Sequence, residues 1–136
     1  MPRCFRHRLR AGYGDTDKSG VVHHAVYLRY LEDARVAMLR DAALDFRQLE
    51  EADRVSLVVA RADVRYLRPT FFDDEIDVEI RVEKLRGASL VLDYRVLRGE
   101  ALLSTASITL ACIDLDALRP KRIPFRAELE RWMEGA

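Results

Sequence analysis

The chain has 136 residues, of which 49% are hydrophobic and 34% charged, and its 23 Lys and Arg residues balance its 23 Asp and Glu residues. This length fits one domain with its own core, and the balanced charge argues against a nucleic-acid partner or an anionic membrane surface. No apolar run approaches the roughly 20 residues of a membrane-spanning helix, and no apolar stretch of a signal peptide follows the basic N-terminus. The two cysteines, Cys4 and Cys112, are too widely spaced for a disulfide framework or a zinc ribbon. We therefore expect a single cytoplasmic domain over residues 1–136, without membrane insertion.

The first part of the chain predicts a strand, a loop and a long helix. Apolar and basic residues alternate over 5–11, and this period of two is typical of a half-exposed strand. Residues 12–20 are rich in Gly, Asp, Ser and Thr, which favour turns. Over 25–43, apolar residues recur at helical spacing among good helix formers. The apolar face of this helix is wide, so we expect other elements to wrap around it, with Tyr27 and Tyr30 in the core.

The rest of the chain predicts strands joined mostly by tight turns, and then a short helix. Period-two alternation or Val- and Leu-rich runs indicate four strands, over 55–66, 76–83, 90–96 and 102–113. Pro124 suits the first position of a C-terminal helix that continues through Trp132. A single apolar helix beside an antiparallel sheet must pack on one face of it. The pattern therefore predicts an α+β fold with one central helix.

Two carboxylates, two imidazoles and two glycines stand close to the start of the predicted helix, in the segment Y-G-D-T-D-K-S-G-V-V-H-H-A-V-Y over 13–27. Metal binding is one interpretation. Asp15 and Asp17 match the first half of a calcium loop, but Val26 stands where that loop has its bidentate Glu. Adjacent His23 and His24 point in different directions on a helix or strand, and no second His- or Cys-rich segment completes a transition-metal site. We therefore expect no metal.

Hydrolysis and helix capping are the other interpretations of this segment. Free backbone N–H groups at a helix start can hold an oxyanion, and a nearby carboxylate can act as a base on water or as a nucleophile. Asp17 lies seven residues before His24, so the loop can fold it over that helix start. Asp and Ser residues near a helix start are also common N-caps. The residues alone therefore leave catalysis and capping open.

The order of these residues resembles the 4-hydroxybenzoyl-CoA thioesterase family of hotdog proteins, in its YbgC-like branch. That branch reads approximately aromatic-x-D-T-D-x-x-G-V-V-Y-H-x-x-Y, followed by E-x-A-R on the helix. The residues that carry the resemblance here are Tyr13, Asp15, Thr16, Asp17, Gly20, Val21, Val22, His24, Tyr27, Glu32, Ala34 and Arg35. It continues through 57–59, Tyr66 with Pro69, 86–90 and 120–124, and so covers nearly the whole chain.

The resemblance implies a hotdog fold, in which an antiparallel sheet of about five strands wraps around one long central helix, in a homodimer or homotetramer. It implies an acyl-CoA thioesterase that needs no cofactor, with Asp17 and His24 as catalytic residues. The backbone N–H near His24 is expected to bind the thioester carbonyl, and CoA is expected between subunits. The substrate-binding residues we expect are Tyr13, Asp15, Gly20, Val22, His23, Arg68, Arg86 and Ser89.

One departure from the family pattern is His23, where the branch has Tyr, and we expect this residue to tune the acyl preference. Glu32 and Arg35 are expected to pair along the helix rather than to act in catalysis. Two other functions compete with hydrolysis. A hotdog dehydratase or hydratase needs a His and a carboxylate at the same substrate carbons. A non-catalytic acyl-CoA binding or scaffold protein needs neither, and the intact Asp17 loop argues against both.

Overall fold

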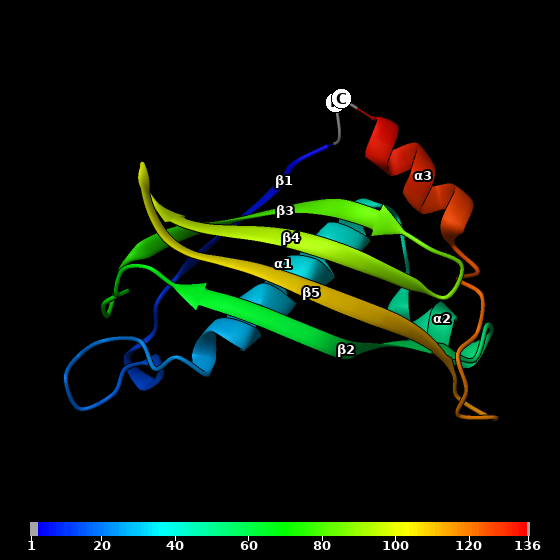
Figure 1. The fold of residues 1–136 in the computed structure, drawn as a ribbon, viewed down its shortest axis with the longest axis horizontal. Helices are drawn as coiled ribbons and strands as arrows, with labels where there is room; N and C mark the ends of the chain where they lie inside the picture. Colours follow the sequence, from blue (N-terminus) through cyan, green and yellow to red (C-terminus); the bar gives the residue numbers. More distant parts are fainter. Residues whose placement is uncertain (1–2, 136) are drawn as a thin grey trace.

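A computed structural model describes residues 3–135 of the chain. Figure 1 shows a curved sheet with one long helix behind it and two shorter helices toward one end. In chain order the elements are β1 (Phe5–Arg10), the short 3₁₀ helix η1 (Tyr13–Asp15), α1 (Val26–Asp41), α2 (Phe46–Glu51), β2 (Val55–Tyr66), β3 (Glu75–Leu85), β4 (Ser89–Arg98), β5 (Ala101–Asp114) and α3 (Arg126–Glu134).

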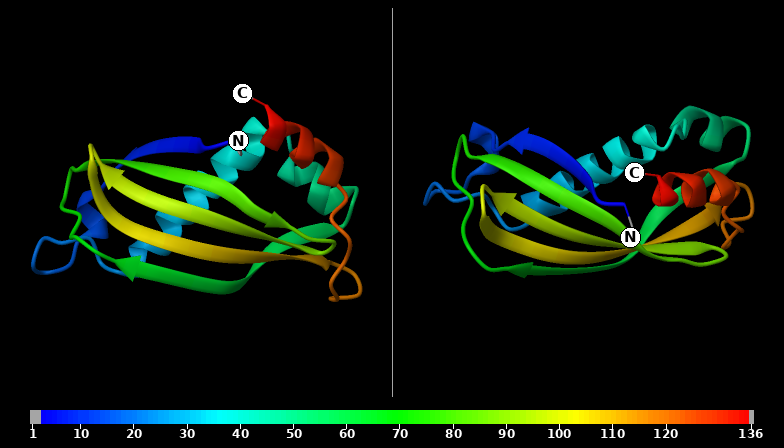
Figure 2. Two further views of the ribbon diagram at one scale, coloured as in Figure 1. Left: turned by 45° about the horizontal axis from the view of Figure 1, so that its top comes forward. Right: turned by 90° about the horizontal axis from the view of Figure 1, so that it is seen from above.

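The five strands form one antiparallel sheet in the order β1-β3-β4-β5-β2. Tight turns place β3, β4 and β5 side by side in chain order, whereas β1 and β2 form the two edges. In the centre of the sheet, Tyr94 of β4 pairs with Ile80 of β3 and with Ala106 of β5. Because side chains alternate along a strand, this register directs one apolar set toward α1. Figure 2 shows α1 crossing that face and the sheet curving around the helix.

The core lies between α1 and the concave face of the sheet. Ala34 and Met38 of α1, four residues apart on one helix face, are 0% exposed, as are Ile80, Leu92 and Leu110 of the three central strands. Burial of this apolar surface is the main favourable contribution to folding. The arrangement confirms the predicted α+β hotdog fold, an antiparallel sheet of five strands wrapped around a long helix.

The predicted elements lie within two residues of the observed bounds, and the differences concern short segments. The helix α2 was not predicted, because six residues are too few to show a period; Asp45 caps it by accepting the Arg47 N–H at 2.9 Å. Pro124 precedes α3 instead of starting it. The predicted pair of Glu32 and Arg35 is confirmed at 3.6 Å. Within residues 3–135, no helix is long and apolar enough to cross a membrane.

The two edges of the sheet differ in their charge and exposure. On β1, three arginines form ion pairs with acidic residues of the neighbouring strand β3, namely Arg6 with Glu79, Arg8 with Asp77 and Arg10 with Glu75. On β2, every residue from 58 to 63 is exposed, including the apolar side chains of Val58 and Val59 at 43% and 51%. The free edge of β2 is thus long and partly apolar, and an edge of this kind can pair with another strand.

Candidate active site

The loop between β1 and α1 holds Asp17 in a tight turn. The Asp17 N–H donates to the Val21 carbonyl at 2.8 Å, and the Gly20 N–H donates to the Asp17 carbonyl at 3.0 Å. Gly20 has a φ of +86°, which other L-residues rarely adopt, so the turn requires glycine at this position. Thr16 and Val22 form a short antiparallel bridge on the two sides of the turn. These bonds fix the backbone of Asp17 relative to the rest of the loop.

The carboxylate of Asp17 is held by its own turn. It accepts hydrogen bonds from the Ser19 hydroxyl at 2.5 Å and from the Ser19 N–H at 2.8 Å. These hydrogen bonds, the hydroxyl first, lower the pKa of the Asp17 carboxyl below its ordinary value. Asp17 is therefore ionised at neutral pH, which is the form that a general base or a nucleophile requires.

The start of α1 leaves one backbone N–H group without an acceptor. The His23 N–H donates to the Asp15 carbonyl at 2.9 Å, and the His23 Nδ1 atom accepts the Ala25 N–H at 3.2 Å. Tyr66 of β2 fixes the position of His24, because its hydroxyl donates to the His24 carbonyl at 2.8 Å. The His24 N–H itself has no hydrogen-bond acceptor among residues 3–135. This N–H group is thus available to a ligand.

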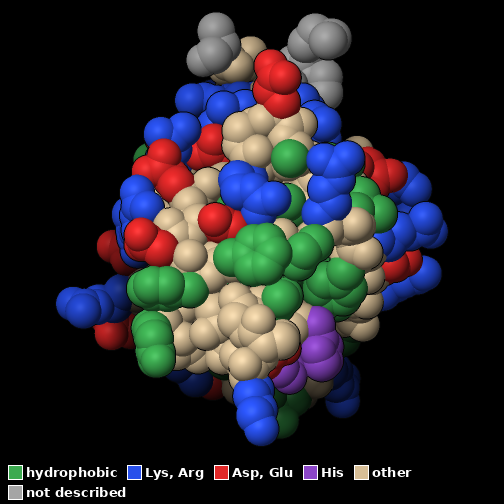
Figure 3. Space-filling view, turned by 90° about the vertical axis from the view of Figure 1, so that its left-hand side faces the viewer, with side chains coloured by type: hydrophobic (Ala, Val, Ile, Leu, Met, Phe, Trp, Pro, Cys, Tyr) green, Lys and Arg blue, Asp and Glu red, His purple; other side chains and the backbone are tan. Residues whose placement is uncertain are grey.

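Asp17 and His24 line one open cleft of about 360 Å³. Its walls are mostly apolar or aromatic, and they comprise Val21, Val22, Tyr27, Tyr66, Leu67, Arg68 and Pro69. The Tyr66 ring lies edge-on to Tyr27, with centroids 5.1 Å apart, and at a right angle to the His24 ring at 6.3 Å. Figure 3 shows hydrophobic side chains gathered near the histidines at this end of the molecule, among Lys and Arg side chains.

The groups in this cleft suit hydrolysis of an acyl compound. A free backbone N–H at a helix start can donate a hydrogen bond to a carbonyl oxygen and stabilise the negative charge that develops on it. An ionised carboxylate in the same cleft can activate water or attack the carbonyl carbon. The apolar walls can contact an acyl group, and the positive charge of Arg68 is available to an anionic ligand.

The structure brings most of the predicted site residues to this loop and cleft. Four of them line the cleft, namely Asp17, Val22, His24 and Arg68. Tyr13, Asp15, Gly20 and His23 belong to the same loop but not to the lining of the cleft. The Asp15 carboxylate in particular is turned into the protein, where it is 8% exposed and bonded to Gly12, Arg29 and Tyr30.

Arg86 and Ser89 lie at the opposite end of the same protomer. Ser89 pairs with Ala111, which pairs with Val58 of β2, whereas Tyr66 of the cleft is eight residues further along that strand. At about 3.3 Å per residue this is a separation of roughly 26 Å. Within one protomer, these two residues are therefore not part of the cleft.

Several cleft residues were not predicted as functional from the sequence. Tyr66, Leu67 and Pro69 come from the end of β2 and the loop after it, and only Tyr66 and Pro69 carried a signal, as parts of the family pattern. Tyr27 is 3% exposed, as expected for a core residue, but one side of it borders the cleft. Its hydroxyl lies 2.5 Å from the Thr70 hydroxyl.

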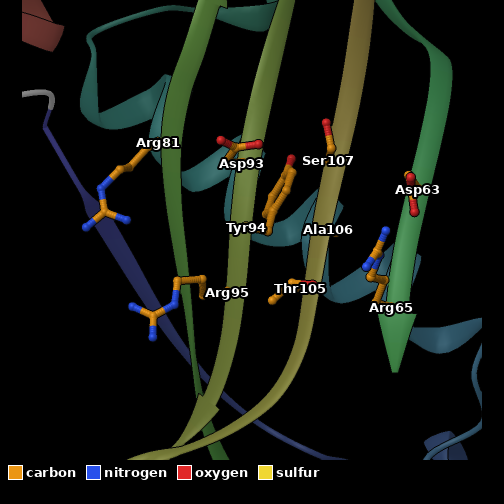
Figure 4. Close-up of a pocket in the computed structure, with 9 residues that line it drawn as sticks. All are labelled: Asp63, Arg65, Arg81, Asp93, Tyr94, Arg95, Thr105, Ala106 and Ser107. Carbon is orange, nitrogen blue, oxygen red and sulfur yellow. The ribbon is translucent and has the colours of Figure 1, made fainter. Parts of the chain in front are cut away.

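A further hollow, of about 380 Å³, lies on the outer face of the sheet, away from α1. Figure 4 shows its acidic and basic side chains distributed over β2, β3 and β4 without converging on one point. Its geometry suits a solvated charged surface better than a catalytic site. Among residues 3–135, no group of three or more His, Cys, Asp or Glu side chains is arranged to bind a metal ion.

Comparison with known proteins places the chain among thioesterases. The family model described as the thioesterase-like superfamily matches residues 11–133. The acyl-CoA thioester hydrolase YbgC of Escherichia coli is 36% identical over 121 residues, which cover 88% of this chain and 90% of that protein. The acyl-CoA thioesterase YbgC of Haemophilus influenzae is 34% identical over 88% of each chain.

A solved structure agrees with these relatives. The crystal structure of a probable thioesterase from Bartonella henselae superposes with a TM-score of 0.85 at 30% identity, over 90% of this chain and all of that one. The family model covers the whole β1–α1 loop and the strands β2 to β5. The chain therefore belongs to the thioesterase-like superfamily, in its hotdog fold.

Proposed function

We propose that this protein is an acyl-CoA thioesterase, which hydrolyses an acyl-CoA thioester to the free acid and CoA at the cleft of Asp17 and His24. The single observation that carries the proposal is that the same mostly apolar cleft is lined by an ionised carboxylate, Asp17, and by His24, whose helix-start N–H has no acceptor among residues 3–135. The E. coli and H. influenzae relatives are named as acyl-CoA thioester hydrolase and acyl-CoA thioesterase, which supports the substrate class.

In the proposed reaction, the thioester carbonyl oxygen accepts a hydrogen bond from the His24 N–H. Along one route, Asp17 takes a proton from water as the hydroxyl oxygen forms a bond to the carbonyl carbon. The tetrahedral intermediate then collapses, the C–S bond breaks, and the thiolate leaves and takes up the proton. Along the second route, the Asp17 carboxylate attacks the carbon, the thiolate leaves, and water hydrolyses the acyl-enzyme anhydride.

We infer a homodimer formed through β2, because the exposed edge of this strand from 58 to 63 is the long unpaired edge of the sheet. Antiparallel pairing of β2 with its copy brings the Val55 end of one strand to the Tyr66 end of the other. Arg86 and Ser89 of the second copy then lie at the same end of the double sheet as the cleft. This supports a CoA site that spans both copies. Light scattering that shows an active monomer would refute the inference.

The anionic part of CoA is proposed to lie along the basic rim of the cleft. Arg68 lines the cleft, and Lys18 stands at the tip of the Asp17 turn; neither forms an ion pair among residues 3–135. Unpaired cations beside a cleft attract a phosphate-bearing ligand, and more strongly at low ionic strength. The two unpaired thiols, Cys4 and Cys112, fit a reducing, cytoplasmic compartment.

The experiment that tests the proposed function measures thiol release from a panel of short aliphatic, long aliphatic and aromatic acyl-CoAs. Hydration of an enoyl-CoA is measured in parallel, because a hotdog hydratase is the competing activity. We expect saturable thiol release with at least one acyl-CoA and no hydration. Hydration without thiol release would replace hydrolysis by the hydratase function, and binding of acyl-CoA without either reaction would indicate a scaffold.

A further inference from the structure

The carboxylate of Asp15 is buried and bound by three donors. It accepts the Gly12 N–H at 2.9 Å, the Tyr30 hydroxyl at 2.7 Å and the Arg29 guanidinium. Gly12 belongs to the segment after β1, whereas Arg29 and Tyr30 belong to the first turns of α1. This one side chain therefore ties the beginning of the Asp17 loop to the helix that the loop precedes.

The backbone of the same residue ties the end of the loop. The Asp15 carbonyl accepts the His23 N–H at 2.9 Å, next to the residue whose own N–H is free. Asp17 is two residues beyond Asp15, and His24 is one residue beyond His23. The Asp17 carboxylate is thus two residues from Asp15, and the His24 N–H is one residue from the His23 N–H that the Asp15 carbonyl accepts.

Besides Asp15, the loop is tied to the connection after β2 by the Val22 N–H, which donates to the Thr70 carbonyl at 2.7 Å, and by the bridge between Val21 and Phe71. Gly14, Asp17, Lys18, Ser19 and Gly20 are exposed, and the main apolar anchor of the segment is Val22, which is 3% exposed. A loop with so few buried apolar side chains depends on its polar bonds for a fixed geometry. Misplacement of a reacting group by about 1 Å can lower a rate about 100-fold.

The charge of Asp15 persists at neutral pH. Burial raises the pKa of its carboxyl, but the hydrogen bonds from Tyr30, Arg29 and Gly12 outweigh burial and leave the pKa below its ordinary value. Burial and the neighbouring Asp15 raise the pKa of Tyr30, so its hydroxyl stays a donor. The bonds of Asp15 to the loop and to α1 therefore remain intact throughout the neutral range.

We propose that Asp15 is a positioning residue for the thioesterase reaction: its carboxylate and carbonyl hold the loop against α1 so that the Asp17 carboxylate and the His24 N–H meet at one substrate carbonyl. The inference rests on the proposed function. In this role Asp15 affects the rate of the chemical step but does not contact the substrate.

The test compares kcat and KM for thiol release in Asp15→Asn, Tyr30→Phe and the double variant. Asn in place of Asp15 turns an NH2 donor toward at least one of the three donors and removes the negative charge that pairs with Arg29, so we expect kcat to fall about 10- to 100-fold. Tyr30→Phe removes one of the three bonds and should lower kcat about 3- to 10-fold. The double variant should be no slower than Asp15→Asn within about twofold, because both changes break the same cluster. KM and the Kd for CoA should stay within about threefold of wild type in all three variants.

The matched control is Asp33→Asn, which makes the same chemical change on the exposed face of α1, four residues after Arg29. Its kcat should remain within about twofold of wild type, the usual result for a surface substitution. If Asp15→Asn fails to fold by circular dichroism, Tyr30→Phe alone decides the question. A folded Tyr30→Phe or Asp15→Asn variant with wild-type kcat would overturn the inference, as would a parallel loss of kcat and CoA affinity.

The proposed function and this inference fail in different ways. If wild-type protein releases no thiol from any acyl-CoA, or if Asp17→Asn keeps full activity, the proposed function is wrong. If Asp17→Asn is inactive while Asp15→Asn keeps its kcat, only the positioning role of Asp15 is wrong.

Discussion

The hydroxyl of Tyr66 offers a graded test of the helix-start geometry. It donates to the His24 carbonyl at 2.8 Å, and it is the contact by which β2 holds the residue whose N–H is free. Tyr66→Phe removes this bond but keeps the ring against Tyr27 and His24. A hydrogen bond of this kind contributes about 0.5–1.5 kcal/mol, which corresponds to a loss of about 2- to 13-fold in rate.

The assay is continuous detection of released thiol under saturating and limiting acyl-CoA. We expect the loss in kcat, with KM nearly unchanged, because the walls of the cleft keep their shape. The matched control is Tyr94→Phe, which removes a buried hydroxyl that has no hydrogen-bond partner within the described residues and lies outside the cleft. Unchanged kcat in Tyr66→Phe would refute the role of this bond, and a loss above about 100-fold would mean that the hydroxyl contacts the substrate itself.

Three further predictions concern single side chains. Ser19→Ala removes the hydroxyl bond that most lowers the pKa of Asp17. The fall of kcat/KM at acidic pH should therefore shift to higher pH, while the plateau at neutral pH stays the same, and an unshifted pH profile would contradict this. Tyr94→Phe should leave the free energy of unfolding in urea unchanged or raise it by up to about 1 kcal/mol, because the buried hydroxyl has no hydrogen-bond partner among residues 3–135, and a clear loss of stability would contradict this. His23→Tyr should keep turnover on some acyl-CoA within about tenfold and shift the kcat/KM ratio of aliphatic to aromatic substrates by about 1–3 kcal/mol. A uniform collapse of kcat/KM across all substrates would mean that His23 acts in catalysis.

The fold could be predicted from the sequence because its signals are local. The alternation along 76–83 and the helical spacing of 25–43 each identify an element without knowledge of its neighbours, and both match the structure closely. The strand order could not be derived in this way. The pairing of β1 with β3 joins residues about seventy positions apart, as in Phe5 with Ile80, and depends on which apolar faces meet in three dimensions.

The candidate site was only partly predictable. The spacing of Asp17 and His24 suggested a shared cleft, and the resemblance to a family assigned roles that the spacing alone left open. The bond from Tyr66 and the burial of Asp15 depend on tertiary contacts over 42 and 15 positions, which no local pattern encodes. The distance of Arg86 from the cleft is likewise a property of the sheet, because a hairpin at one end of a strand cannot be near the other end of the same protomer.

The role of Asp17 is tested most directly by the turnover of Asp17→Asn on the best acyl-CoA of the panel. The substitution is nearly isosteric and removes the base or nucleophile, so kcat should fall by about 10²–10⁴-fold or more. Circular dichroism and the Kd for CoA should match wild type, since Asp17 is exposed and bonds only within its own turn. Near wild-type turnover in this folded variant would contradict the assignment of Asp17 and direct attention to Glu32 of α1.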